Sequence, residues 1–151
     1  MGVISFIRSP EKNRITDDLE KQFGINKLPY LLFRVGREKI RGYSGHLSKE
    51  EIAKLARIAR VEIIGIYLIK KEQDFRLSLD AIHLLKDQVS KSIIDLNDEQ
   101  FHKWIRGHDL EVKDAQLGTI VIRYNGDFVG CGKSNGQKIF NYVPKDRRLR
   151  N

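Results

Sequence analysis

Cysteine is nearly absent from this chain of 151 residues, which has a single thiol at Cys131. One cysteine cannot form an internal disulfide, so the sequence carries no sign of an oxidising compartment. Residues 1–8 contain too short an apolar run for a signal peptide, and the sequence has no apolar run of about 18 residues, the length that a membrane span needs. We therefore expect a soluble cytoplasmic protein with no membrane partner.

The sequence also lacks the motifs that carry common chemistry. No glycine-rich dinucleotide or phosphate loop is present, and the segment Gly130-Cys131-Gly132-Lys133-Ser134 lacks both the upstream glycine and the following helix of a phosphate loop. No histidine lies at a familiar metal-ligand spacing; the four are His46, His83, His102 and His108. Cys131 lies in a predicted strand, where a small buried residue is the simplest interpretation. We expect no catalytic residue, no cofactor and no metal site.

What the chain does have is a core and a basic excess. Hydrophobic residues make up 40% and charged residues 32%, enough apolar material for folding into one ordinary domain or two small ones. Lys and Arg number 28 against 20 Asp and Glu, a net charge of +8. Such an excess attracts polyanions, although a solvated charged surface also explains it.

Helix and strand signals alternate in the first half. Ser9-Pro10 opens a predicted helix that ends near Phe23, with Gly24 as its stop. Residues 30–35 and 39–43 predict a hairpin around Gly36-Arg37. Further on, a capping box at Ser48 predicts a helix, residues 61–69 and 75–77 predict strands, and Ser78 caps a short helix through Leu85.

The second half is richer in strands and glycine. Residues 92–96 predict a strand, and Asn97 opens a helix that ends at Gly107. Short strands follow at residues 119–124, 128–132 and 138–142, and Asn125-Gly126 is a strong hairpin signal. The polar stretch 87–91 lies between the halves, so we expect an α+β fold with a small α/β domain at 1–90 and a β-rich domain at 91–151.

Positive charge gathers near the end of the chain. The last 19 residues carry six cations, Lys133, Lys138, Lys145, Arg147, Arg148 and Arg150, against the single acid Asp146, a net charge of +5. Clustered cations favour phosphate binding because each neutralised phosphate releases counterions. Arg106, His108, Arg123 and Tyr142 could join this surface, and close approach of the backbone to a sugar-phosphate chain favours the neighbouring glycines. The alternative is a frayed basic tail.

Two other features have weaker claims to nucleic-acid contact. The first hairpin carries four cations, Arg34, Arg37, Lys39 and Arg41, which a solvated strand face explains equally well. Phe101 and Trp104 could stack on bases, but their spacing of three on one helical face favours core packing.

Four segments of the second half carry a recognisable pattern: residues 96–110 (LNDEQFHKWIRGHDL), 118–122 (GTIVI), 129–133 (VGCGK) and 139–144 (IFNYVP). Together they resemble the PUA-like module of Sun-family rRNA cytosine-5 methyltransferases. Residues 27–85 resemble the small α/β domain that precedes that module, and residues 75–77 with 81–85 also resemble two-domain PUA ribosome-biogenesis factors. The resemblance thus implies that the whole chain is a stand-alone pair of such domains.

The resemblance implies a pseudobarrel that holds structured RNA through the turn at residues 107–109, the strand at 130–133 and the basic end after Pro144. The candidate RNA-binding residues are Arg106, Gly107, His108, Arg123, Lys133, Lys138, Tyr142, Lys145, Arg147, Arg148 and Arg150. The methyltransferase domain, its donor-binding glycines and its Pro-Cys nucleophile have no counterpart in this sequence, so methyl transfer is not implied.

We therefore expect a non-catalytic protein that binds rRNA or tRNA in ribosome biogenesis or RNA modification. The alternative is an adaptor that recruits a separate RNA-modifying enzyme. An RNA methyltransferase or a ribosome-assembly factor is the protein partner that the resemblance suggests.

Overall fold

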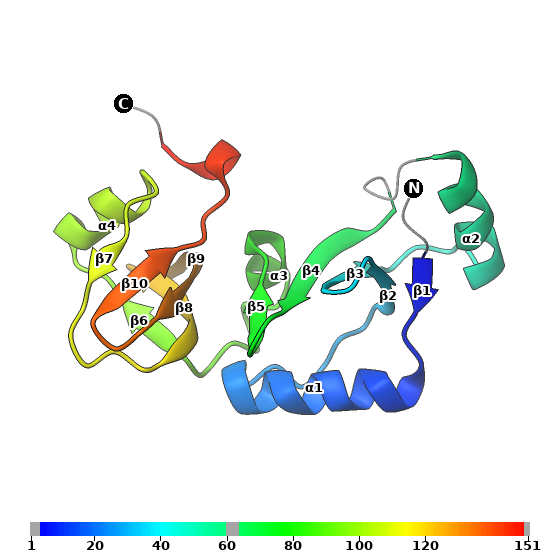
Figure 1. Ribbon diagram of the computed structural model, residues 1–151, viewed down its shortest axis with the longest axis horizontal. Helices are drawn as coiled ribbons and strands as arrows, with labels where there is room; N and C mark the ends of the chain where they lie inside the picture. The colour runs from blue at the N-terminus through cyan, green and yellow to red at the C-terminus, as the bar shows by residue number, and fades with distance from the viewer. Residues whose placement is uncertain (1–3, 60–63, 150–151) are drawn as a thin grey trace.

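Two five-stranded sheets lie side by side in the computed structural model, which describes residues 4–59 and 64–149 (Figure 1). The first sheet has the order β1-β2-β3-β4-β5, with strands β1 (Ile4–Phe6), β2 (Leu31–Val35), β3 (Lys39–Tyr43), β4 (Ile66–Lys71) and β5 (Phe75–Leu77). The second has the order β6-β8-β9-β10-β7, with strands β6 (Ile93–Asp95), β7 (Leu110–Glu111), β8 (Gly118–Tyr124), β9 (Asp127–Ser134) and β10 (Lys138–Asn141). The α+β fold class expected from the sequence is confirmed.

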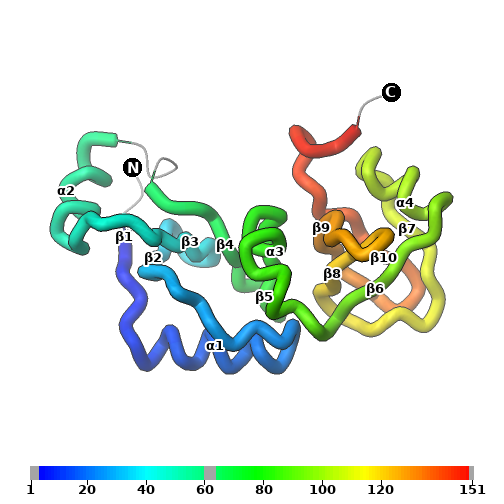
Figure 2. The backbone as a smooth tube through the Cα atoms, turned by 180° about the vertical axis from the view of Figure 1, so that it is seen from behind, coloured from blue at the N-terminus to red at the C-terminus, as the bar shows by residue number. Residues whose placement is uncertain are grey.

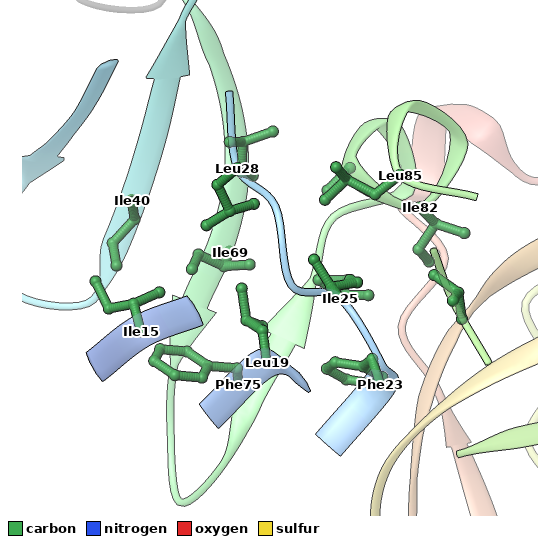
Figure 3. Close-up of a cluster of buried hydrophobic side chains, with 14 of the residues drawn as sticks. Ile15, Leu19, Phe23, Ile25, Leu28, Ile40, Ile69, Phe75, Ile82 and Leu85 are labelled. Atoms are coloured by element: carbon green, nitrogen blue, oxygen red, sulfur yellow. The ribbon is translucent and has the colours of Figure 1, made fainter. Parts of the chain in front are cut away.

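Helix α1 (Ser9–Phe23) covers one face of the first sheet. Pro10 stands in its first turn, and Gly24 ends it in the left-handed conformation at φ +86°. Ile15, Leu19 and Phe23 form its buried stripe and pack with Ile40 and Ile69 of the sheet (Figure 3). Full burial of each such side chain contributes about 1.5–3 kcal/mol.

Helix α2 (Lys49–Ile58) begins with the predicted capping box. The Ser48 hydroxyl accepts a hydrogen bond from the Glu51 amide, and the Glu51 carboxylate accepts one from the Ser48 amide. The strand expected at residues 61–69 starts only at Ile66 among the described residues, and 61–63 lie outside them. Gly65 is the reason for the late start, because its φ of +69° breaks the extended chain after buried Ile64.

The second sheet wraps around an apolar interior. Its hairpin β8–β9 turns at Asn125-Gly126, whose φ angles of +48° and +84° confirm the turn expected there. Strand β6 pairs with β8 in parallel, and helix α4 (Asp98–Trp104) follows β6. The short edge strand β7, which the sequence pattern did not predict, pairs with β10.

The polar stretch between the sheets is fastened to the end of α1. The Gln88 amide oxygen accepts hydrogen bonds from the Asn26 and Lys27 amides at 3.0 and 2.9 Å, and the Ser90 amide donates to the Phe23 carbonyl at 2.9 Å. A side chain at Gly24 would collide with the Ser90 hydroxyl. The predicted boundary at residue 90 thus falls on an ordered connection, and the division at 90 and 91 itself stays a prediction.

The two sheets share buried contacts. Helix α3 (Leu79–Leu84) lies between them in both views of the chain (Figures 1 and 2). Val121 of β8 and Cys131 of β9 belong to the same buried cluster as Leu77, Ala81 and Ile82 of the first part of the chain. The outer face of the β8–β9 hairpin is therefore partly covered by β5 and α3.

A carboxylate fixes one end of this contact. Asp74, in the turn between β4 and β5, accepts hydrogen bonds from the amide of Thr119 at 2.8 Å and from its hydroxyl at 2.7 Å. Thr119 is 4% exposed. We call this whole contact between the two sheets the seam. Its residues are Asp74, Leu77, Ala81, Ile82, Thr119, Val121 and Cys131.

Replacing Asp74 by alanine tests the seam. Asp74→Ala leaves the buried Thr119 groups without their acceptor, and we expect a loss of about 1.5–3 kcal/mol in the free energy of unfolding. Urea denaturation measures it, with exposed Asp127→Ala as the matched control. Equal stability of the two variants would show that Asp74 does not hold the sheets together.

Candidate nucleic-acid interface

Trp104 explains the glycines of the second sheet. Its indole is fully buried and donates from Nε1 to the Val129 carbonyl at 3.0 Å. A Cβ on Gly130 would lie 3.0 Å from Trp104 Nε1, and one on Gly132 would lie 2.9 Å from Trp104 Cη2 and 2.6 Å from the Phe140 carbonyl oxygen. These two glycines make room for the indole and for β10, a reason different from the backbone approach to RNA that we expected.

Asn141 ties β10 to the end of α4. Its side-chain amide donates to the Trp104 carbonyl at 2.8 Å and to the His108 carbonyl at 3.0 Å, and its oxygen accepts from the Val143 amide at 2.8 Å. The residue is 9% exposed. Asn141, in the segment 139–144 of the resemblance, therefore positions the turn at Gly107 and the segment leading to Pro144.

The basic end of the chain docks on that turn. Gly107 has a φ of +90°, and a Cβ there would lie 2.5 Å from Arg148 Cδ and Nε. Arg148 Nε donates to the Val143 carbonyl at 2.9 Å, and the Leu149 amide donates to the Ile105 carbonyl at 2.7 Å. A frayed tail is thus the wrong interpretation as far as Leu149, and Arg150 lies outside the described residues.

The remaining groups at this turn are polar and basic. Arg106 donates from Nη1 to the His102 carbonyl at 2.8 Å, and His108 is exposed. Lys145, exposed at the start of a 3-10 helix (Lys145–Arg147), completes a surface that we call the turn face. The turn face consists of Arg106, Gly107, His108, Lys145 and Arg148.

A second surface lies on the outer side of β9 and β10. Lys138 and Phe140 alternate with buried Ile139 and Asn141, so both point outward, and Tyr142 continues the same alternation. Lys133 of β9 stands directly opposite Phe140 in the register. Lys138 Nζ lies 5.4 Å from the Phe140 ring centroid, and Phe140 is 38% exposed.

The first sheet extends this surface across the seam. The Arg76 guanidinium of β5 lies over the Tyr142 ring at 3.9 Å. Lys133 Nζ approaches Gln73 Oε1 at 3.5 Å, and Arg147 pairs with Asp80 of α3 at 3.4 Å. We call the row Lys138, Phe140, Lys133, Tyr142 and Arg76 the aromatic strip.

Sequence reasoning found part of the strip and missed the rest. Lys133, Lys138 and Tyr142 were candidates, whereas Phe140 and Arg76 were not. The alternation of Lys138, Phe140 and Tyr142 along one strand is a signal that could have identified Phe140. Nothing local could have identified Arg76, because its partner is 66 positions away in the chain.

A cavity of about 270 Å³ opens at the inner end of the strip. Tyr67, Arg76 and Leu79 line it from the first part of the chain, and Gly130, Tyr142 and Arg147 are among the residues that line it from the second. Burial raises the pKa of the Tyr67 and Tyr142 hydroxyls, so both keep their protons at neutral pH.

Arg123 does not join either surface. It lies at the hairpin end of β8, paired in register with Phe128, whereas Lys133 lies opposite Thr119 at the other end. Its guanidinium holds the Asp95 carboxylate through two bonds of 2.6 and 2.9 Å, and this hydrogen bonding lowers the pKa of Asp95. The charge of Arg123 is therefore largely compensated.

The cations of the first hairpin serve mainly local contacts. Arg34 holds the Glu11 carboxylate through two bonds of 2.8 and 2.7 Å, and Arg41 donates to the carbonyls of Ile64 and Gly65. Lys39 is the exception, because its Nζ lies 5.3 Å from the Tyr67 ring centroid beside the seam.

The lone thiol is buried at the seam. Cys131 is 4% exposed, and burial raises its pKa to about 12. Within residues 4–59 and 64–149, no group of three or more His, Cys, Asp or Glu side chains could hold a metal ion. No helix in that part of the chain is long and apolar enough to span a membrane.

Comparison with known proteins agrees with this architecture. Residues 91–149 match the family model described as the methyltransferase RsmF PUA domain. A PUA domain protein from Thermoplasma acidophilum has a similar fold, with a TM-score of 0.58 and 14% identity over 91% of this chain and 92% of that chain. Residues 91–149 are therefore similar to a PUA domain, as the resemblance led us to expect.

More particularly, this domain is similar to that of ribosomal RNA small subunit methyltransferase F. The Vibrio vulnificus YJ016 protein is 26% identical over 88 residues, 58% of this chain and 19% of the relative. The Aeromonas salmonicida protein is 25% identical over 150 residues, and the Psychromonas ingrahamii protein 22% over 155, each covering 97% of this chain. The chain spans between 19% and 31% of the length of these relatives.

The contacts of Asn141 lead to a stability prediction. Asn141→Ala removes three hydrogen bonds and leaves the Val143 amide without its acceptor, although the Trp104 carbonyl keeps its bond from the Gly107 amide. We expect a loss of about 2–4 kcal/mol in the free energy of unfolding. The exposed Asn26→Ala is the matched control and should change stability by less than about 0.5 kcal/mol. Urea denaturation compares them, and a loss below about 1 kcal/mol at Asn141 would contradict its tethering role.

Burial of Cys131 leads to a prediction on pH. Its thiol ionises near its ordinary value of 9.0 when unfolded but only near 12 when folded, so the folded state holds this proton more tightly and its advantage is lost as pH rises from 9 to 12. Cys131→Val has no thiol and therefore does not lose stability in this way as pH rises. We expect the stability of the variant relative to the parent to rise by up to about 1.4 kcal/mol per pH unit in that window and to stay constant below it. Denaturation at a series of pH values checks this, and parallel curves would contradict it.

Proposed function

We propose that this chain is an RNA-binding protein that acts on rRNA or tRNA without catalytic machinery of its own. The observation that carries the proposal is the aromatic strip, in which three cations lie beside the exposed Phe140 ring and the half-buried Tyr142 ring. Ammonium and guanidinium groups neutralise phosphates, and exposed rings stack on unpaired bases. A surface that offers cations and aromatic rings side by side fits a nucleic-acid strand better than it fits an acidic protein.

The turn face supports the same function. Arg148 is packed on Gly107, and the side chain of Lys145 is exposed. The 3-10 helix connects the two surfaces, because Arg147 reaches Asp80 across the seam while Arg148 reaches back to Gly107. A strand that lies on the aromatic strip can therefore continue onto the turn face.

The relatives favour rRNA over tRNA as the ligand. They are named ribosomal RNA small subunit methyltransferases, and the similarity to the Aeromonas salmonicida and Psychromonas ingrahamii proteins covers 97% of this chain, which includes most of residues 91–149. Binding to small-subunit rRNA in the cytoplasm, during ribosome biogenesis or rRNA modification, is the corresponding role. The buried Cys131, with its raised pKa, is not placed as a nucleophile, which supports a non-catalytic role.

An adaptor is the second candidate. Helix α2 lies at the end of the first sheet far from the second (Figure 1), and its Ile58 is 85% exposed. Ile58 is an apolar residue that a protein partner could cover at this end of the molecule, and an RNA methyltransferase or assembly factor could be recruited there. Retention of one protein partner after nuclease treatment, lost in Ile58→Glu, would favour this role.

Neutralising the strip tests RNA binding. The double variant Lys133→Ala/Lys138→Ala should weaken binding to a small-subunit rRNA fragment. The negative slope of log K against log salt should become shallower by roughly 0.7–0.9 for each lost phosphate contact. Arg123→Ala is the matched control and should change the slope little, because Asp95 already compensates its charge. Fluorescence anisotropy across a salt series measures the slopes.

A tRNA fragment measured beside the rRNA fragment distinguishes the two ligands. Alanine replacement of the basic end tests whether that segment also binds the RNA. The residues to replace are Lys145, Arg147, Arg148 and Arg150. Undetectable binding of the parent protein at low ionic strength would overturn the RNA-binding proposal. Equal slopes for the double variant and Arg123→Ala would remove the strip as the binding surface.

A further inference from the structure

The cavity at the seam has a size that limits its ligand. Its volume of about 270 Å³ is just below the range of roughly 300–1,000 Å³ that accommodates drug-sized molecules. A cavity of this size admits one flat ring with its substituents and excludes a base pair. It also opens beside the aromatic strip, since Arg76 and Tyr142 belong to both.

The walls offer the contacts that a nucleobase uses. A guanidinium plane has two faces, and Tyr142 covers one face of Arg76 at 3.9 Å. Bases stack on arginine planes as they do on aromatic rings. Tyr67 adds a second aromatic wall whose hydroxyl, like that of Tyr142, makes no hydrogen bond with another residue in the described part of the chain.

The charges at the mouth distinguish a nucleotide from a bare anion. Arg147 lines the cavity and offers a cation to a phosphate, but the carboxylates of Asp80 and Asp146 line it too. Two carboxylates disfavour a free phosphate ion. They are suitable acceptors for the amino and imino groups of a base.

The cavity is preformed. Gly130 and Cys131 line it and follow Val129, whose carbonyl accepts a hydrogen bond from Nε1 of the buried Trp104. Val143 and Pro144 also line it, and the Val143 amide donates to the Asn141 side chain. A ligand therefore does not have to order the site before it binds, which lowers the cost of binding.

We propose that this cavity takes one unpaired nucleotide of the bound RNA, with its base on the face of Arg76 that Tyr142 does not cover and its phosphate toward Arg147. Glu72 contacts Arg76 at the Nη1 atom, at 3.5 Å. The inference rests on the proposed function and specifies which part of an RNA is recognised. A paired base stays stacked in its helix, so the protein should prefer RNA with a bulged or looped-out nucleotide.

Two RNA hairpins of the same stem test this, one fully paired and one with a single bulged nucleotide. Stacking of one base contributes about 1–3 kcal/mol, so the parent protein should bind the bulged hairpin on the order of tenfold more tightly. Arg76→Ala should bind both hairpins equally. Arg76→Lys should also lose the preference, because lysine keeps the charge but has no plane.

A second pair of variants separates local from general effects. Leu79→Trp fills the cavity from α3 and should abolish the preference with Arg76 intact. Lys133→Ala should weaken both hairpins by the same factor and preserve the preference. Thermal unfolding of every variant confirms that it folds, and 2-aminopurine at the bulge should lose fluorescence on binding to the parent but not to Leu79→Trp.

The outcomes distinguish this inference from the proposed function. If the parent binds neither hairpin at low salt, RNA binding itself fails. If the parent binds both hairpins equally, or if Leu79→Trp retains the preference, the protein binds RNA but the cavity does not hold a nucleotide.

Discussion

The candidate site depends on the burial of one side of the β8–β9 hairpin against the first sheet. Val121 and Cys131 point outward from the second sheet, yet both are buried because Leu77, Ala81 and Ile82 cover them. The Asp74 carboxylate holds Thr119 at the edge of the same contact. Without this seam Arg76 would not reach Tyr142, and the cavity would lack three of its walls, Tyr67, Arg76 and Leu79.

The same hairpin is constrained from its inner side by Trp104. A strand with a large indole beneath it needs small residues where the ring passes, and Gly130 and Gly132 occupy those positions. The glycines let the strand lie close to the ring while their neighbours Cys131 and Lys133 point outward to the seam and to solvent. The interior of the second sheet thus determines which outward positions can carry side chains for binding.

Much of the fold was predictable because its signals are local. The capping boxes at Ser48 and Asn97, the stop at Gly24 and the turn at Asn125-Gly126 each depend on residues within four positions of one another, and each is present. The predicted start of β4 was wrong because the extended chain is broken at Gly65, within the apolar run from which the strand was predicted. The parallel pairing of β6 with β8 and the edge strand β7 were not predicted, because strand partners far along the chain leave no local pattern.

The site was less predictable than the fold, because it depends on contacts between residues far apart in the chain. Charge counting selected Lys133, Lys138 and Tyr142, which the structure brings together, and also Arg123, which it places at the opposite end of β8 beside Asp95. Sequence shows where a cation is but not whether an acid compensates it. Arg34 is held by Glu11 through two short bonds, whereas Arg76 has a single long contact of 3.5 Å with Glu72 and lies on the strip. The two arginines look alike in the sequence.

Net charge is therefore a poor guide to where a polyanion would bind here. Of the cations in the basic end, Arg147 faces an acid across the seam and Arg148 is used to pack the turn, while Lys145 stays exposed. The long 3.4 Å contact between Arg147 and Asp80 is solvent-exposed, and such pairs contribute little to stability. Arg147 can exchange that partner for a phosphate at small cost, whereas Arg148 cannot leave Gly107 without opening the turn. Position within the packing, more than charge, decides which of these arginines is free to serve a ligand.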